Sequence, residues 1–253
     1  MLVINCGSQI DLTALDGVNI GAIIFMAQGG EEGGNALADI LCGRVTPSGK
    51  LTDSWAYKYE NNPASDEYGI LGNVLEQQYK EGIYVGYRYF DTFGVDVRYP
   101  FGFGLSYTKF EIATKSIDAE KSVVKLKVAV KNAGTEYSGK EVVQVYLAKP
   151  QGAIKCERHM LCAFAKTKGL RPNESEELTL TFDLTDFAVY DERDAKYVLQ
   201  SGKYGVFIGN SIKDITPVAV LNLDAEVVTE ICKSVCKKRG EFNEITADIK
   251  DET

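Results

Sequence analysis

Apolar and polar residues alternate along the second half of the chain. In KSVVKLKVAVKN, Val124, Leu126, Val128 and Val130 occupy every second position, a period of two that is typical of strands with one buried face. Turn signals separate such segments about every ten residues. About seven short strands in this pattern predict an antiparallel immunoglobulin-like sandwich of the fibronectin type III kind over residues 110–224. The strands are expected in KSVVKLKVAVKN, KEVVQVYLAK, MLCAFAKT, ELTLTFDL, YVLQ, YGVFIGN and PVAVLNLD.

The first part of the chain has a different pattern, in which short apolar runs alternate with a helix-like segment. MLVINC and GAIIFMA are bounded by turn residues, as buried parallel strands are. In GGNALADILCG, Leu37, Ile40 and Leu41 form the apolar face of a short helix. The polar segment 57–72 is expected to be a long loop. We therefore interpret residues 1–109 as a partial α/β sandwich, which makes the fold class α/β plus all-β.

The last residues, 225–253, are rich in charge. EVVTEICKSVCKKRGEF predicts a short amphipathic helix, and the polar residues after it are interpreted as a linker or a free tail. Cys232 and Cys236 lie on this predicted helix, but a zinc site has little support because the chain has one histidine. The six cysteines are interpreted as free thiols in a reducing compartment, and no metal site is expected.

Composition excludes several classes of function. A net charge of −8 argues against nucleic-acid binding, which needs a basic surface. No apolar run approaches the roughly 20 residues of a membrane span. The opening MLVINCGSQIDL has neither a basic segment nor a cleavage site, so it does not read as a signal peptide, and a cytoplasmic protein is expected. FGFG is only part of a dinucleotide fingerprint and no P-loop occurs, so we expect no cofactor.

Nine aromatic residues, interleaved with glycines, lie between Glu81 and Thr108. A platform for stacking nucleic-acid bases would also be basic, and this stretch balances two arginines against three acidic residues. Most of these aromatic side chains are therefore expected to pack at the junction between the two domains. The glycines indicate tight turns and a close approach of backbone segments.

Two carboxylates lie in the glycine-rich loop GGEEGGNALAD. Glu31 and Glu32 precede the predicted helix, where the helix dipole alone would stabilise a negative charge. The functional alternative is a loop that faces a polar ligand, in which Glu32 binds a sugar hydroxyl or holds a neighbouring arginine. Both interpretations stay open at this point.

Three stretches together resemble the β-glucosidases of glycoside hydrolase family 3. They are GGEEGGNALADILCGRVTPSGKLTDSWA, EGIYVGYRYFDTFGVDVRYPFGFGLSYTKFE, and the segment from VKNAGTEYSGKEVVQVYLAKP to YGVFIGNS. The resemblance implies that the second stretch closes the α/β-sandwich domain and leads into the fibronectin type III-like domain. It also implies that nearby loops border a sugar site, with Glu31, Glu32, Glu81 and Arg88 as border residues.

The same resemblance implies that no catalytic residue lies in this sequence. Family 3 enzymes resemble two-carboxylate retaining glycosidases, with a nucleophilic aspartate on a (β/α)8 barrel and an acid/base glutamate before the strand that MLVINC resembles. The segment AFAKTKGLRPNESEELTLTFDLTDFAVYDE and the tail resemble a subgroup in which the barrel comes last. We therefore expect a fragment or subunit of an enzyme that hydrolyses terminal β-linked glucosyl or xylosyl residues, inactive alone.

Two alternatives accompany this expectation. One is a non-catalytic fibronectin-like module that binds carbohydrate or protein. Tyr146 is a candidate exposed aromatic for it, although YLA is equally the end of a core strand. The other is a relocated carboxylate pair of Glu32 and Glu81. The resemblance also predicts an unpaired sheet edge near Leu2–Ile4 and Ile23–Phe25, which would favour a partner chain or a homodimer.

Overall fold

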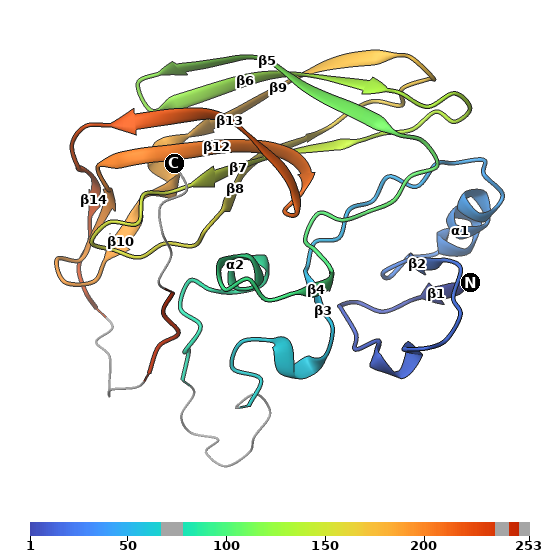
Figure 1. Ribbon diagram of the computed structural model, residues 1–253, viewed down its shortest axis with the longest axis horizontal. Coiled ribbons are helices and arrows are strands. Elements are labelled where there is room, and N and C mark those ends of the chain that lie inside the picture. Colours follow the sequence, from blue (N-terminus) through green and yellow to red (C-terminus); the bar gives the residue numbers. More distant parts are fainter. Residues whose placement is uncertain (67–77, 236–242, 248–253) are drawn as a thin grey trace.

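The computed structural model describes residues 1–66, 78–235 and 243–247. Its larger part is a sandwich of two antiparallel sheets, and a smaller part with two short helices lies beside one face of that sandwich (Figure 1). Among the described residues, no helix has the length and apolar character of a membrane span.

The sandwich has the two sheets that the alternating pattern predicts. One has the strand order β5-β6-β9 and the other β13-β12-β7-β8. The inward side chains of β6 and β7, such as Leu126 and Val145, are completely buried between the sheets. The strands are β5 (Phe110–Glu120), β6 (Val123–Asn132), β7 (Val142–Ala148), β8 (Met160–Lys166), β9 (Ser175–Asp183), β12 (Gly202–Ser211) and β13 (Asp214–Leu223).

Strand β7 is buried on both of its faces, which sets it apart from the half-exposed β6. Val143, Val145 and Leu147 face the sandwich core. The alternate residues Gln144 and Tyr146 are 4% and 0% exposed. Because side chains of a strand alternate between faces, a second layer covers the outer face of β7, and this layer is the N-terminal part.

Three expectations for individual strands are corrected. YVLQ was expected in the sandwich, but β11 (Lys196–Leu199) lies in a separate sheet with the order β10-β11-β14, where β10 is Val189–Asp191. The strand β5 was not among the expected ones. In the described part of the predicted tail helix, Val227–Ile231 form the strand β14 instead, and their β-branched residues favour a strand. Residues 236–242 of that prediction, including Cys236, lie outside the described residues. Period-two patterns identify a strand but not the strand it pairs with.

The N-terminal part contains the expected parallel pair and helix. β1 (Leu2–Ile4) pairs in parallel with β2 (Ile23–Phe25), and α1 spans Gly33–Leu41. Trp55 lies at the centre of a small apolar cluster with Ile4 and Leu12. The remaining elements of this part are the antiparallel pair β3 (Trp55–Ala56) and β4 (Val97–Tyr99), α2 (Tyr87–Thr92), and the 3-10 turns η1 (Thr13–Leu15) and η2 (Tyr59–Asn61). A third 3-10 turn, η3 (Leu184–Phe187), follows β9 of the sandwich.

The polar segment 57–72 is confirmed only in part as a loop. Up to residue 66 it holds turns and the short η2, without a long helix or strand. Residues 67–72 lie outside the described part of the chain.

Candidate functional site

A cavity of about 500 Å³ opens in the N-terminal part. Its walls come from the segment after β1, from the region of η2, and from the turn before α2. Carboxylate, amide, hydroxyl and ammonium groups line it, which are groups that bind the hydroxyls of a polar ligand. The lining consists of residues 8–11, Ala56, Lys58, Tyr59, residues 62–65, Gln78 and Glu81.

Asp11 holds two walls of this cavity together. One carboxylate oxygen accepts hydrogen bonds from the backbone N–H and the hydroxyl of Thr13, at 2.7 and 2.6 Å. The other accepts from the backbone N–H of Tyr59 at 3.2 Å. The hydrogen bond from the Thr13 hydroxyl is the largest of the effects that lower the pKa of Asp11. The carboxylate therefore remains charged at neutral pH, where it can accept further hydrogen bonds.

Glu81 is the one predicted border residue among the residues that line the cavity. It is half-buried and lies in the turn between residues 79 and 85, where its carbonyl oxygen accepts from the backbone N–H of Tyr84 at 2.8 Å. Gly82 follows with a φ of +52°, a conformation that favours glycine. Two acidic residues, Asp11 and Glu81, thus line the cavity.

Glu31 and Glu32 lie apart from the cavity lining. Both are exposed in the turn before α1. Glu32 accepts a hydrogen bond from the Asn35 side chain at 2.5 Å, which supports the interpretation as a residue of the helix N-terminus. The alternative that pairs Glu32 with Glu81 finds no support in this geometry, because only Glu81 faces the cavity.

The loops after β1 and β2 nevertheless share one edge. The two strands are parallel, so their carboxyl ends point the same way. An added Cβ at Gly7 would lie 3.2 Å from the Gln28 side chain, which shows that the two loops are in contact. The loop that carries Glu31 and Glu32 therefore begins next to the segment that lines the cavity.

Arg88, the fourth predicted residue, lies in α2 and is half-buried. It is not among the residues that line the cavity. Its helix, however, directly follows the turn of Glu81 and contacts the sandwich.

The contact between α2 and the sandwich combines aromatic rings with hydrogen bonds. The Tyr87 ring stacks on Phe101 with centroids 4.6 Å apart and meets Tyr146 edge-on at 6.2 Å. The Tyr87 hydroxyl oxygen accepts from the backbone N–H of Leu161 at 2.9 Å. The expectation that aromatic side chains pack this junction is confirmed for Tyr87, whereas several other aromatic residues of this stretch pair with rings inside the N-terminal part. Tyr146 is buried in the junction, which supports the alternative of a core strand end rather than an exposed binding residue.

Two further contacts of α2 are polar. The Thr92 hydroxyl oxygen accepts from the backbone N–H of Arg158 at 3.0 Å. Asp91 and His159 form a buried pair, with 2.8 Å between carboxylate oxygen and Nδ1. His159 also meets the Phe207 ring edge-on at 4.8 Å. His159 is therefore a buried packing residue of the junction.

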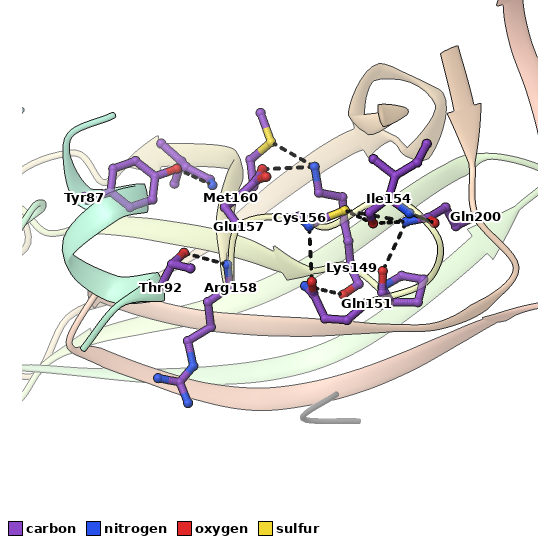
Figure 2. A network of polar contacts seen from close by, with 12 residues as sticks. Tyr87, Thr92, Lys149, Gln151, Ile154, Cys156, Glu157, Arg158, Met160 and Gln200 are labelled. Atoms are coloured by element: carbon purple, nitrogen blue, oxygen red, sulfur yellow. Dashed lines mark hydrogen bonds and ion pairs between the residues drawn. The ribbon is translucent and has the colours of Figure 1, made fainter. Parts of the chain in front are cut away.

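The backbone donor Arg158 lies in the loop between β7 and β8, and Leu161 lies at the start of β8. Buried side chains hold the shape of this loop (Figure 2). Lys149 and Glu157 form an ion pair of 3.0 Å with side chains 7% and 3% exposed. Gln200 binds both the N–H and the carbonyl of Ile154, at 2.9 and 2.8 Å. Burial raises the pKa of the Cys156 thiol to about 11, so this cysteine is a neutral packing residue.

Gly102 allows a close approach across the junction. Its φ is +81°, and an added Cβ would lie 2.6 Å from the Gln144 side chain and 2.8 Å from the Cα of Ser211. Gly102, the first glycine of PFGFG, is therefore required both by its positive φ and by the lack of space for a Cβ. The sequence predicted such tight turns and close approaches.

Tyr87→Phe is expected to lower the free energy of unfolding by about 1–2 kcal/mol, because the partly buried backbone N–H of Leu161 loses its acceptor. Urea denaturation followed by circular dichroism measures this change. Tyr79→Phe is the matched control, since Tyr79 is 77% exposed. Equal stability of the two variants would contradict the role assigned to the Tyr87 hydroxyl.

Sequence reasoning missed every cavity residue except Glu81, including the polar residues Asp11, Lys58 and Asn62. Asp11 had a usable signal, because polar residues that follow a buried parallel strand gather at the carboxyl edge of the sheet. Lys58 and Asn62 had none, since they belong to a loop whose path depends on tertiary contacts. Within the described ranges, no cluster of three or more histidine, cysteine, aspartate or glutamate residues could hold a metal ion.

Comparison with protein-family models identifies two regions. Residues 1–107 match the glycosyl hydrolase family 3 C-terminal domain, and residues 141–212 match the fibronectin type III-like domain. The chain belongs to glycosyl hydrolase family 3. The resemblance inferred from the motifs is therefore confirmed, while the order of domains in the whole enzyme stays a prediction.

Individual family 3 proteins match over nearly the whole chain. The β-glucosidase of Ruminococcus albus is 38% identical over 236 residues, which cover 91% of this chain and 24% of that protein. The structure of a β-glucosidase from Paenibacillus barengoltzii has a TM-score of 0.86 at 38% identity, covering 92% of this chain and 27% of that one. β-Glucosidase 3B from Thermotoga neapolitana in complex with α-D-glucose has a TM-score of 0.84 at 34% identity, covering 90% and 32%. The chain thus spans about a quarter of the length of the R. albus relative.

Proposed function

We propose that this chain supplies the α/β and fibronectin type III-like portion of a retaining β-glucosidase that removes terminal β-linked glucosyl or xylosyl residues. The observation that carries the proposal is the 38% identity with a β-glucosidase over 91% of the chain. The reaction needs a nucleophilic carboxylate and an acid/base carboxylate on either side of the glycosidic bond. On this proposal both come from outside the present sequence, and the nucleophile comes from a (β/α)8 barrel.

In this proposal the cavity borders the sugar site. Asp11 and Glu81 accept hydrogen bonds from sugar hydroxyls, and Lys58 donates one. Asp11 is suited to this role because Thr13 and Tyr59 already hold its orientation, so little side-chain entropy is lost on binding. The role of the sandwich is to fix α2, and with it the turn of Glu81, through the buried contacts of the junction.

The proposal extends to a partner. Within the described residues, β1 and β2 pair only with each other, and both strands carry half-buried apolar side chains. Open edges of this kind pair readily with further strands. We propose that the open edges of β1 and β2 pair with the chain region that carries the barrel. The competing partner is a second copy of this chain, and light scattering of the purified protein would detect the resulting dimer.

A glucose titration tests the proposed sugar site. Glucose is expected to slow amide exchange in residues 8–11 and 56–65, and Asp11→Asn or Glu81→Gln is expected to weaken its binding by about tenfold. Glu31→Gln is the matched control, because Glu31 is exposed and outside the cavity lining. The chain alone is expected to show no turnover of an aryl β-glucoside. Turnover by the chain alone would place the catalytic pair within it and contradict the proposal.

A further inference from the structure

Part of the C-terminal tail lies against the segment that leads into α2, although the sequence predicted a linker or a free tail. The backbone N–H of Ile245 donates to the carbonyl of Lys80 at 2.8 Å. A backbone hydrogen bond also joins Ala247 to the hydroxyl of Tyr84. In Figure 1 the described part of the tail, in dark red, runs beside the chain that leads into α2.

Side chains of the tail also take part in this contact. Glu244 and Thr246 are exposed, Ile245 is half-buried, and Ala247 is only 8% exposed. This alternation is that of an extended segment with one face against the protein. Two hydrogen bonds and a packed face together distinguish this contact from the chance path of a chain end.

The two hydrogen bonds lie on either side of Glu81 in the sequence. Lys80 precedes Glu81, and Tyr84 closes the same turn by donating its N–H to the Glu81 carbonyl. Tyr84 is 4% exposed and meets the Phe93 ring edge-on at 5.1 Å, at the end of α2. The turn is therefore fixed between the tail and α2.

We propose that residues 243–247 form a strap that holds the segment 80–84 and so positions Glu81 in the cavity. Ile245, Ala247 and Tyr84 are positioning residues, because they act on the carboxylate through the turn. A turn held on both sides has fewer conformations, so Glu81 loses less freedom when it binds a ligand. The contact between residues 243–247 and 80–84 follows from the geometry alone. Its effect on sugar binding rests on the proposed function.

Two substitutions that each introduce a carboxylate test the strap in the full chain. Ala247→Asp places a carboxylate on the buried face, and Thr246→Asp places the same group on the exposed face. Ile245→Pro removes the N–H that binds Lys80. Ala247→Asp and Ile245→Pro are expected to speed amide exchange in residues 78–86 by about tenfold, with Thr246→Asp unchanged. Wild-type exchange in both Ala247→Asp and Ile245→Pro would overturn the strap.

Carbodiimide labelling of carboxyl groups, read by mass spectrometry, tests the positioning of Glu81 without any sugar. Labelling of Glu81 is expected to rise severalfold in Ala247→Asp and to stay at the wild-type rate in Thr246→Asp and in the conservative Ala247→Ser. Glu31 is the internal reference, since it is exposed in the wild-type protein. Faster exchange in residues 78–86 with unchanged labelling of Glu81 would overturn the positioning role.

The glucose titration separates this proposal from the proposed function. Ala247→Asp is expected to weaken glucose binding by about tenfold relative to Thr246→Asp, with an unchanged melting temperature. Unaltered affinity in a variant whose turn exchanges faster would overturn the positioning role. A wild-type chain that binds no glucose would contradict the proposed function, while exchange and labelling would still decide the strap.

Discussion

Lys149→Met is expected to lower the free energy of unfolding by about 3–5 kcal/mol, since it leaves a buried carboxylate without its cation. Glu157 is 3% exposed, and the Lys149 ammonium lies 3.0 Å from its carboxylate. Methionine keeps most of the apolar side-chain stem of lysine. The loss of stability therefore measures the effect of the charge more than that of packing. Urea denaturation followed by circular dichroism measures the change.

An exposed ion pair supplies the control for this prediction. Arg44 and Asp39 are 3.1 Å apart with side chains 71% and 39% exposed. Arg44→Met is expected to cost less than about 1 kcal/mol, because water screens such pairs. The double variant Lys149→Met/Glu157→Gln should regain part of the loss, since no buried charge remains. A loss in Lys149→Met no larger than in Arg44→Met would show that the pair does not stabilise the β7–β8 loop.

Asn132→Ala should be similarly destabilising, by about 3–5 kcal/mol, because it leaves several buried polar groups without partners. Asn132 is completely buried at the end of β6. Its amide nitrogen donates to the carbonyls of Tyr137 and Leu170, both at 2.9 Å. Its oxygen accepts from the Thr108 hydroxyl at 2.6 Å and from the backbone N–H of Gly134 at 3.0 Å.

These bonds attach the connection between the two parts of the chain to the sandwich. Asn132→Asp keeps the shape and the acceptor but loses both donors, so it is also expected to destabilise the protein. Asn222→Ala is the matched control, because Asn222 is exposed and its side chain bonds only to Asp224 among the described contacts. The same urea denaturation measures all three variants. Similar stability of Asn132→Ala and Asn222→Ala would contradict this account.

The buried Gln144 shows why the junction matters to both parts. Its side chain contacts the backbone of Gly102 on one side, donates to the carbonyl of Asn210, and accepts from the Tyr146 hydroxyl. An ordinary half-exposed strand would carry a solvated polar residue here. The covered outer face of β7 instead turns polar residues of the sandwich into partners of the N-terminal part.

The sequence by itself determined the local elements of this protein. The period-two runs specified most strands of the sandwich, the apolar face of GGNALADIL specified α1, and the glycines of PFGFG indicated a close approach. Each of these depends on neighbours within a few residues, because backbone conformation and one buried face are local properties.

Only the tertiary structure decided which residues meet. Asp91 and His159 are 68 positions apart, and neither carries a local signal for the other. The same holds for the tail, where β14 forms because β11 offers it an edge, and for Ala247, which reaches Tyr84 across the molecule. Such contacts depend on how helices, strands and loops pack against one another. Packing is determined by the shapes and polar groups of both surfaces, and no single stretch of sequence contains both.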